Sequence, residues 1–208
     1  CGFNYSFGRG GTAGPEDMAR LCARCGVRTA TVSPVCLSGK AVSSTYIRRL
    51  VEQGEMEQAA AMLGRPFALR FAVVHGRELG RRLGMPTINQ PLPGTHVVPR
   101  FGVYAAAVPV NGHVYAAVTD VGCKPTVGSD RVQAETYLLG YSGDLYGREV
   151  TVELLHFLRP EKRFGSVEAL GRQMRQDARQ AARYGRKSRR RVTSPAGRVD
   201  SDSGATIP

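Results

Sequence analysis

The sequence contains no apolar run near the ~20 residues that a membrane-spanning helix requires. The first residues, Cys-Gly-Phe-Asn-Tyr, have neither the basic region nor the apolar core of a secretory signal peptide. Cysteine is sparse, with five residues in a chain of 208. An odd, low number of cysteines favours reduced thiols over a disulfide framework. These absences predict a cytoplasmic protein without a membrane segment.

The sequence also lacks the second half of a zinc site. Cys22-x-x-Cys25 has metal-binding spacing, but no second pair of matching spacing exists. We interpret the pair as small residues near a helix end that Gly26 closes. The chain does not begin with Met, which suggests a fragment or an excised region.

Acidic residues are scarce relative to basic ones: 17 Asp and Glu stand against 29 Lys and Arg, for a net charge of +12. A basic run at residues 186–191 holds part of this excess. Such a chain can bind nucleic acid non-specifically, bind a polyphosphate ligand, or simply be soluble. Because no zinc-finger spacing, RNA-binding sheet motif or aromatic-basic ladder is present, no specific nucleic-acid partner is expected.

In the first third of the chain, helix and strand signals follow one another as in an α/β fold. Proline and acidic residues open a predicted helix at Pro15–Cys25, and alternation predicts a strand at Val27–Val35. Ser43 or Ser44 is a natural N-cap for a helix that reaches about Gln53. A short helix is predicted over Met56–Leu63, and Gly64 ends it.

From Phe67 onward the pattern changes to short runs rich in Val, Tyr, Phe and Thr. These predict an antiparallel sheet or barrel, with strands at Phe67–Val74, Gly102–Val110, His113–Asp120, Val132–Leu139 and Val150–Leu158. Asn111-Gly112 predicts a two-residue type I′ turn between two of them.

A final helix is predicted from Ser166, its N-cap, as far as Gly185. Its apolar residues recur at three- and four-residue steps, which indicates a helix that covers the barrel. The Ser-, Gly- and Pro-rich end after Gly185 is predicted to be disordered, and residues 186–208 are treated as a basic tail.

A glycine-flanked basic loop leads directly into a Pro-Thr-x-Asn segment at residues 80–89. Glycine lets backbone N–H groups approach a phosphate closely, and arginine adds positive charge. In an extended segment the side chains of Thr87 and Asn89 leave the same face. A hydroxyl and an amide oxygen on one face suit Mg²⁺ that keeps some of its water. The loop therefore suggests a site for a nucleotide with its metal, although glycine-rich turns without a ligand are also common.

Several further segments, taken in order, resemble the bacterial bifunctional riboflavin kinase/FAD synthetase family. Residues 2–8 and the Ser-Ser-Thr-x-Ile-Arg segment at residues 43–48 resemble its FMN adenylyltransferase domain. The kinase series comprises residues 84–89, Gly-Val-Tyr-Ala at 102–105, Lys-Pro-Thr at 124–126, Glu-Thr at 135–136 and Leu-Tyr-Gly at 145–147. The resemblance covers about residues 1–184.

The resemblance implies two domains. Residues 1–66 would be the C-terminal part of a Rossmann-like nucleotidyltransferase domain. Residues 67–185 would form the riboflavin kinase domain, a six-stranded antiparallel Greek-key barrel with a C-terminal helix. No two histidines have the spacing of the family's His-x-Gly-His motif. We therefore expect this chain to form no FAD.

The resemblance further implies transfer of the ATP γ-phosphoryl group to riboflavin, which gives FMN, with ATP as co-substrate and Mg²⁺ as cofactor. Glu135 would be the catalytic base, and Thr87 and Asn89 would hold Mg²⁺. Cofactor and substrate contacts are expected at Gly76, Gly80, Arg81, Gly84, Thr87, Asn89, Arg159 and Phe164. Asn4, Ser44, Thr45 and Arg48 match nucleotide contacts of the adenylyltransferase domain.

Several of these residues could instead have an ordinary structural role. Glu135 could be an ordinary strand carboxylate, Phe164 could pack between barrel and helix, and Ser44 and Thr45 could only cap a helix. Phe71 stands where the family usually has glycine, so the local backbone is expected to differ there. The alternative to an active kinase is a flavin- or nucleotide-binding barrel with impaired catalysis.

Overall fold

The computed structural model of the protein describes residues 1–76, 80, 83–126 and 129–192. Its contacts divide the chain into two compact units, with the boundary between Ile47 and Arg48. The domain limits predicted at residues 66 and 185 stay predictions. Within the described ranges, every helix is too short or too polar to span a bilayer.

The first unit contains a short 3-10 helix, η1 (Arg9–Gly11), the helix α1 (Pro15–Arg24) and a two-stranded ribbon of β1 (Cys36–Leu37) and β2 (Lys40–Ala41). Helix α1 begins where the sequence predicts it, because Pro15 occupies the first turn and Asp17 accepts a hydrogen bond from the Gly14 N–H at 2.8 Å. The predicted helix at Pro15–Cys25 is thus confirmed to within one residue.

The strand predicted at Val27–Val35 is wrong. Within that segment the backbone makes one isolated parallel bridge, between Val32 and Gly2. A strand needs a neighbour along its length to satisfy its backbone, and the first unit supplies only this bridge. All the residues from 1 to 47 are at least partly exposed. The Rossmann-like remnant is therefore not confirmed.

Two helices precede the main sheet. Helix α2 (Ser44–Gln53) begins after Ser43, whose hydroxyl accepts the Tyr46 N–H at 3.2 Å, so Ser43 is its N-cap. Helix α3 (Met56–Leu63) ends at Gly64, as predicted, and Gly64 has a left-handed conformation (φ 71°). Helix α3 packs against β3 and β8 of the sheet.

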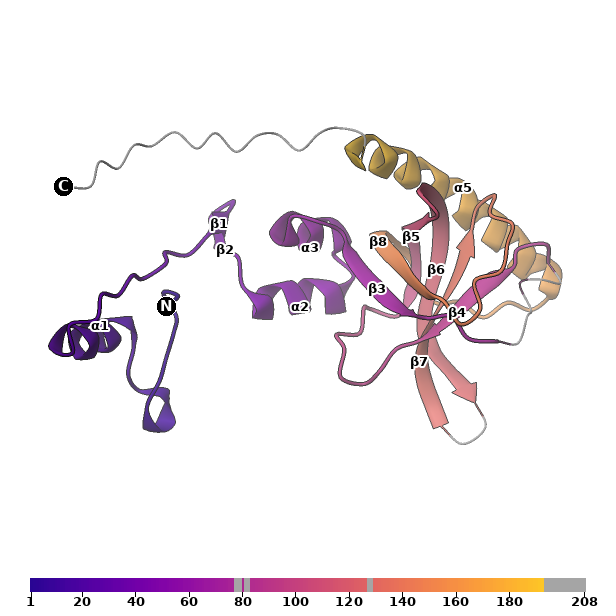
Figure 1. Cartoon of the computed structure of the whole chain (residues 1–208). Helices are drawn as coiled ribbons and strands as arrows, with labels where there is room; N and C mark the ends of the chain where they lie inside the picture. Colours follow the sequence, from indigo (N-terminus) through magenta and orange to yellow (C-terminus); the bar gives the residue numbers. More distant parts are fainter. Residues whose placement is uncertain (77–79, 81–82, 127–128, 193–208) are drawn as a thin grey trace. The chain divides into compact units, whose positions relative to one another are not determined.

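The second unit is built on a six-stranded antiparallel sheet (Figure 1). Its spatial order is β3-β8-β5-β6-β7-β4. The strands are β3 (Phe67–Ala72), β4 (Thr87–Pro91), β5 (Gly102–Val110), β6 (His113–Thr126), β7 (Ser129–Leu138) and β8 (Glu149–Arg159). Strands β5, β6 and β7 form a meander, and β8 returns beside β5, which is the Greek-key connection. The β5–β6 turn has positive φ at Asn111 and Gly112, as the type I′ prediction requires.

The sheet curls so that its first and last strands meet. The Val74 N–H, just beyond β3, donates to the Asn89 carbonyl of β4 at 2.8 Å. The fully buried Gln90 side chain donates to the carbonyls of Phe71 and Val150 at 2.7 and 2.8 Å. These bonds tie together the two edges of a half-barrel. The predicted six strands and their antiparallel order are confirmed, and the predicted barrel takes the form of a curled half-barrel. Phe71 lies in regular register opposite Val150.

The long helix α5 (Val167–Val192) packs on β5, β6 and β8. Strand β5 is consequently covered on both faces, and seven consecutive residues from Gly102 to Val108 are buried. The helix begins as predicted, because the Ser166 hydroxyl accepts the Ala169 N–H at 3.2 Å.

The helix does not end at Gly185. Its backbone stays helical to Val192, so the disorder predicted from residue 186 is wrong as far as residue 192. Residues 193–208 lie outside the described residues. Gly185 is buried, and a Cβ there would lie 2.5 Å from the Cβ of Ala116 on β6. This glycine allows close packing of the helix on the sheet, and the Arg and Lys residues after it are good helix formers.

Candidate active site

A cavity of about 310 Å³ lies between one face of the curled sheet and helix α5. Its wall takes residues from strands β4 to β8, from the connection after β8 and from α5 itself. Its polar and charged lining residues include Thr87, Asp120, Glu135, Arg159 and Asp177. The volume lies within the range of small-molecule sites.

The strand register produces a row of side chains beside this cavity. Arg159 of β8 is opposite Val103 of β5, which is opposite Asp120 of β6. Asp120 is opposite Glu135 of β7, and Glu135 is opposite Asn89 of β4. Directly opposed residues project from the same face of a sheet, so five strands present one continuous row. The sequence separates the ends of this row by 70 residues, and only the topology brings them together.

Glu135, the predicted base, is half-buried and lines the cavity. Its Oε1 accepts a hydrogen bond from Gln133 Nε2 at 3.0 Å, which holds the carboxylate in one orientation. The hydrogen bond comes from the same strand, two residues away, where side chains leave the same face. A carboxylate at a cavity wall can accept a proton from a bound ligand, which is the task of a general base.

Thr87 and Asn89 lie on the same face of β4, as predicted, and Asn89 is buried. Two of the predicted glycines lie directly against them. A Cβ at Gly76 would overlap the Asn89 carboxamide, and a Cβ at Gly80 would overlap the Met85 carbonyl and lie 3.4 Å from the Thr87 hydroxyl. Gly76 therefore leaves room for the Asn89 carboxamide, and Gly80 allows the close approach of the Met85 carbonyl beside Thr87. Gly84 adopts the left-handed region (φ 71°) in the turn before β4, and Arg81 lies outside the described residues.

This hydroxyl and amide oxygen fit Mg²⁺, which takes one or two protein ligands and otherwise phosphate oxygens and water. Over the described part of the chain, no group of three or more His, Cys, Asp or Glu side chains could hold a metal ion.

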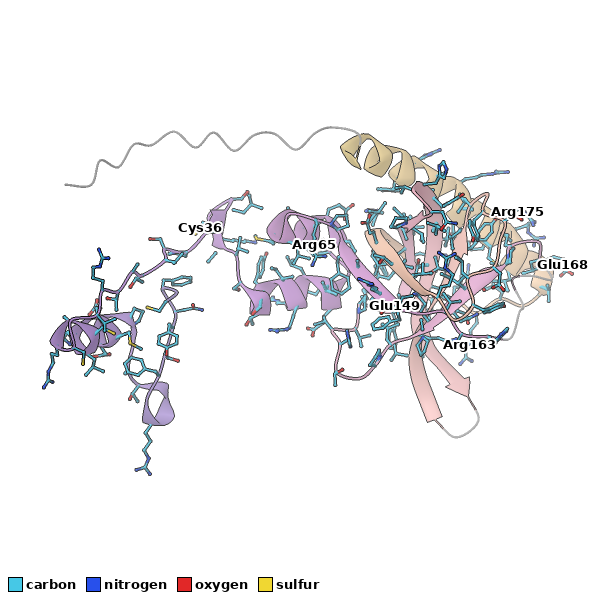
Figure 2. All side chains as sticks on the ribbon, in the orientation of Figure 1. Cys36, Arg65, Glu149, Arg163, Glu168 and Arg175 are labelled. Carbon is cyan, nitrogen blue, oxygen red and sulfur yellow. The ribbon has the colours of Figure 1, made fainter. Side chains whose placement is uncertain are left out.

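Arg159 and Phe164 are both at the cavity, as predicted. The Arg159 guanidinium lies 5.8 Å from the Phe164 ring centroid, within cation–π distance. Its strongest contact is Asp177 on α5, with Nη2 to Oδ2 at 2.8 Å. Figure 2 shows Arg163 on the connection into α5, and Glu168 and Arg175 on the helix itself.

The sequence analysis missed Asp177, although a signal was present. The residue lies three positions after Met174 and four before Ala181, inside the apolar stripe of the helix. A carboxylate in an apolar stripe is buried on folding and needs a partner. Asp120 of β6 also lines the cavity.

A second cavity of about 480 Å³ opens at the same end of β4, where the strand begins. Its lining includes Thr87, Ile88, Leu138 and the segment from Tyr141 to Tyr146. The Tyr146 ring stacks on His75, with centroids 3.8 Å apart. Thr87 lines both cavities, so they adjoin at the Pro-Thr-x-Asn segment.

The other predicted contacts lie outside this arrangement. Asn4, Ser44 and Thr45 belong to the first unit, and Arg48 is the first residue of the second. Ser44 and Thr45 occupy the first turn of α2, where Ser43 provides the cap. Their nucleotide-binding role stays a prediction.

Comparison with known proteins identifies a family for most of the second unit. The family model described as "Flavokinase: Riboflavin kinase" matches residues 63–185. The matched region takes in the six-stranded sheet and most of helix α5, and it exceeds half of the chain. The chain therefore belongs to the riboflavin kinase family.

Similar proteins carry a bifunctional name. The bifunctional riboflavin kinase/FMN adenylyltransferase of Listeria monocytogenes is 34% identical over 178 residues, which cover 85% of this chain and 56% of that protein. The enzyme of the same name from Pseudomonas fluorescens is 42% identical over 64% of this chain and 43% of its own length. A Streptococcus pneumoniae crystal structure titled as a macrolide-efflux protein superposes with a TM-score of 0.77 at 31% identity, over 87% of this chain and 58% of that one. The chain spans roughly half the length of the curated relatives that it matches.

Proposed function

We propose that this chain transfers the γ-phosphoryl group of ATP to the terminal ribityl hydroxyl of riboflavin and so produces FMN and ADP. The proposal rests on the position of Thr87, which lines both cavities. Asn89 lies on the same face of β4 and is directly opposed to Glu135 on β7. Two substrates bound on either side of this point would meet where the candidate base and metal ligands are. Family membership supports the identity of the two substrates.

Riboflavin is assigned to the cavity beneath α5. Its apolar wall, with Leu83, Val103, Leu170 and Met174, suits the isoalloxazine ring. The ribityl chain would then extend toward Glu135 and Thr87. ATP is assigned to the second cavity, where the Tyr146 ring, which stacks on His75, offers an aromatic surface to a base.

In the proposed reaction, the Glu135 carboxylate accepts the proton of the ribityl hydroxyl. The hydroxyl oxygen forms a bond to the γ-phosphorus, and the bond between that phosphorus and the oxygen bridging to ADP breaks. Thr87 and Asn89 would hold Mg²⁺, which neutralises phosphate charge when it is bound. The backbone N–H groups of the glycine-containing loop, at Gly76 and Gly80, would contact the phosphates.

The test is FMN formation by the purified chain from riboflavin, ATP and Mg²⁺, with FMN and FAD followed in one chromatogram. We expect FMN, and no FAD, because the sequence contains no His-x-Gly-His motif. A parallel reaction with a non-hydrolysable ATP analogue controls for FMN carried over from purification. Riboflavin binding without ADP release would replace the kinase proposal with the binding-module alternative.

A further inference from the structure

Asp177 is an acidic side chain buried where α5 meets the sheet. The residue is 2% exposed, and it faces the candidate riboflavin cavity from the helix. Its carboxylate accepts three hydrogen bonds from Arg159: Nη2 to Oδ2 at 2.8 Å, and Nε to Oδ2 and Oδ1 at 3.2 and 3.3 Å. Gln173 Nε2, one helical turn earlier, donates to Oδ1 at 2.9 Å. The carboxylate is thus held from two elements.

This arrangement leaves part of the Arg159 guanidinium available. Of its five N–H groups, Nε and one on Nη2 face Asp177, and one on Nη1 donates to the Pro160 carbonyl at 3.0 Å. Among the described residues, no acceptor takes the remaining N–H on Nη1 or on Nη2. Arg159 lines the cavity, with 20% of its side chain exposed. Two donors on a rigid planar group thus remain for a ligand.

Stability alone is a weak reason for such a pair. Removing two charges from water costs free energy that their mutual attraction offsets only in good geometry, and apolar pairs of similar volume are often as stable. A guanidinium fixed by a carboxylate loses little further freedom when it binds a ligand, so its hydrogen bonds to that ligand cost less entropy. The pair is therefore better suited to recognition than to holding the helix in place.

We propose that Asp177 is a positioning residue for riboflavin: it fixes Arg159 so that the two remaining N–H groups meet the carbonyl edge of the isoalloxazine ring. The inference rests on the proposed function, because it takes the cavity beneath α5 as the riboflavin site. Each carbonyl oxygen of the oxidised isoalloxazine ring has an unprotonated ring nitrogen close to it, and a planar fork of donors matches such a pair of acceptors. Phe164, next to the guanidinium, lines the same cavity. Helix α5 is then part of the binding site as well as a cover for the sheet.

The experiment measures riboflavin affinity by flavin fluorescence, without ATP, and the KM for each substrate. In Asp177→Asn we expect the riboflavin Kd and KM to rise about tenfold or more, since hydrogen bonds to charged groups contribute on that scale. The KM for ATP should stay within about twofold, because the ATP cavity does not include this pair. Glu149→Gln, at an exposed ion pair with Arg70, is the control for loss of an acidic side chain.

A second pair of variants separates positioning from folding. Arg159→Met combined with Asp177→Leu replaces the ion pair with apolar groups, and we expect it to fold and to bind riboflavin at least about tenfold more weakly. Arg159→Lys keeps the charge but loses the planar fork, and we expect weaker riboflavin binding there as well. If Asp177→Asn or the Met/Leu variant bound riboflavin with wild-type affinity, this inference would be overturned and the proposed function would still stand. A wild-type chain that binds no riboflavin overturns the proposed function and this inference with it.

Discussion

Asn89 and Glu135 are directly opposed on neighbouring strands, β4 and β7, and their side chains leave the same face of the sheet. The register therefore places a metal-ligand candidate beside a general-base candidate without any loop between them. Sites built on strands hold their groups more precisely than sites on loops. This pairing is the structural basis of the predictions on catalysis below.

Glu135→Gln should lower kcat by about 10²–10⁴, the usual contribution of a positioned base, while the KM for riboflavin changes little. The amide has the shape of the carboxylate but cannot accept the hydroxyl proton. Steady-state kinetics of FMN formation would measure the effect. The exposed Glu149→Gln variant should retain wild-type kcat, and a Glu135→Gln variant of equal activity would rule out the role of base.

Thr87→Val should raise the Mg²⁺ concentration for half-maximal activity by about tenfold or more, the scale on which metal sites respond to altered ligand shells. Valine has the shape of threonine without the hydroxyl that would contact the metal. Thr87→Ser, which keeps the hydroxyl, is the matched control and should stay close to wild type. A titration of activity with Mg²⁺ at saturating ATP distinguishes them. Equal Mg²⁺ dependence in Val and Ser variants would contradict the assignment.

Gln90→Leu should lower the free energy of unfolding by about 2–4 kcal/mol, because the Phe71 and Val150 carbonyls each lose a buried donor. Urea unfolding followed by circular dichroism would measure it. Gln58→Leu, at an exposed position on α3, should change the stability by no more than about 0.5 kcal/mol. If the two variants were equally stable, the Gln90 side chain would not be what joins the edges of the sheet.

Gly185→Ala and Gly171→Ala should have opposite effects, although both lie inside α5. A Cβ at Gly185 would press on Ala116, so this variant should lose about 1–3 kcal/mol of stability. A Cβ at Gly171 meets no atom nearer than 3.5 Å, so that variant should gain up to about 1 kcal/mol from helix propensity. Adding Ala116→Gly to Gly185→Ala should restore part of the loss. Thermal unfolding would compare the four proteins.

Glu153→Gln should stabilise the protein at neutral pH, and the gain should shrink on acidification. Burial on β8 raises the pKa of Glu153, and the positive charge of Arg65 only partly opposes this. The folded state then binds the proton more readily than the unfolded state, so wild-type stability falls as pH rises through the interval between the unfolded and folded pKa values. Below the pKa that Glu153 has in the unfolded chain, the wild type and Glu153→Gln should differ least in stability. Denaturant unfolding across the acidic range tests this, and a difference that does not depend on pH would contradict it.

Local signals in the sequence predicted several elements closely. Ser166 as an N-cap, Gly64 as a helix end and Asn111-Gly112 as a turn are each decided by residues within one or two turns of the chain. The Val27–Val35 segment has strand-like alternation, but no partner strand lies along it in the described structure. Alternation of apolar and polar residues indicates that a segment could form a strand, but it does not show whether a neighbouring strand is there to pair with it.

Gly185 shows that a local signal can also mislead within a helix. A glycine before a basic run resembles a helix end, whereas in the structure it is the contact point of α5 with Ala116 of β6. The role of a glycine depends on whether its missing side chain serves a turn or a close approach. Only the packing partner decides between them.

By itself the sequence determined the chemistry that is available: the Pro-Thr-x-Asn segment, the acidic residue at 135 and the glycines before β4, because these are residue types at short spacing. The tertiary structure alone decided which of them meet. Strand register set Asn89, Glu135 and Asp120 in one row, and helix packing brought Asp177 to Arg159. Such contacts depend on the topology of the whole sheet and on how α5 packs against it, and no local pattern in the chain specifies them.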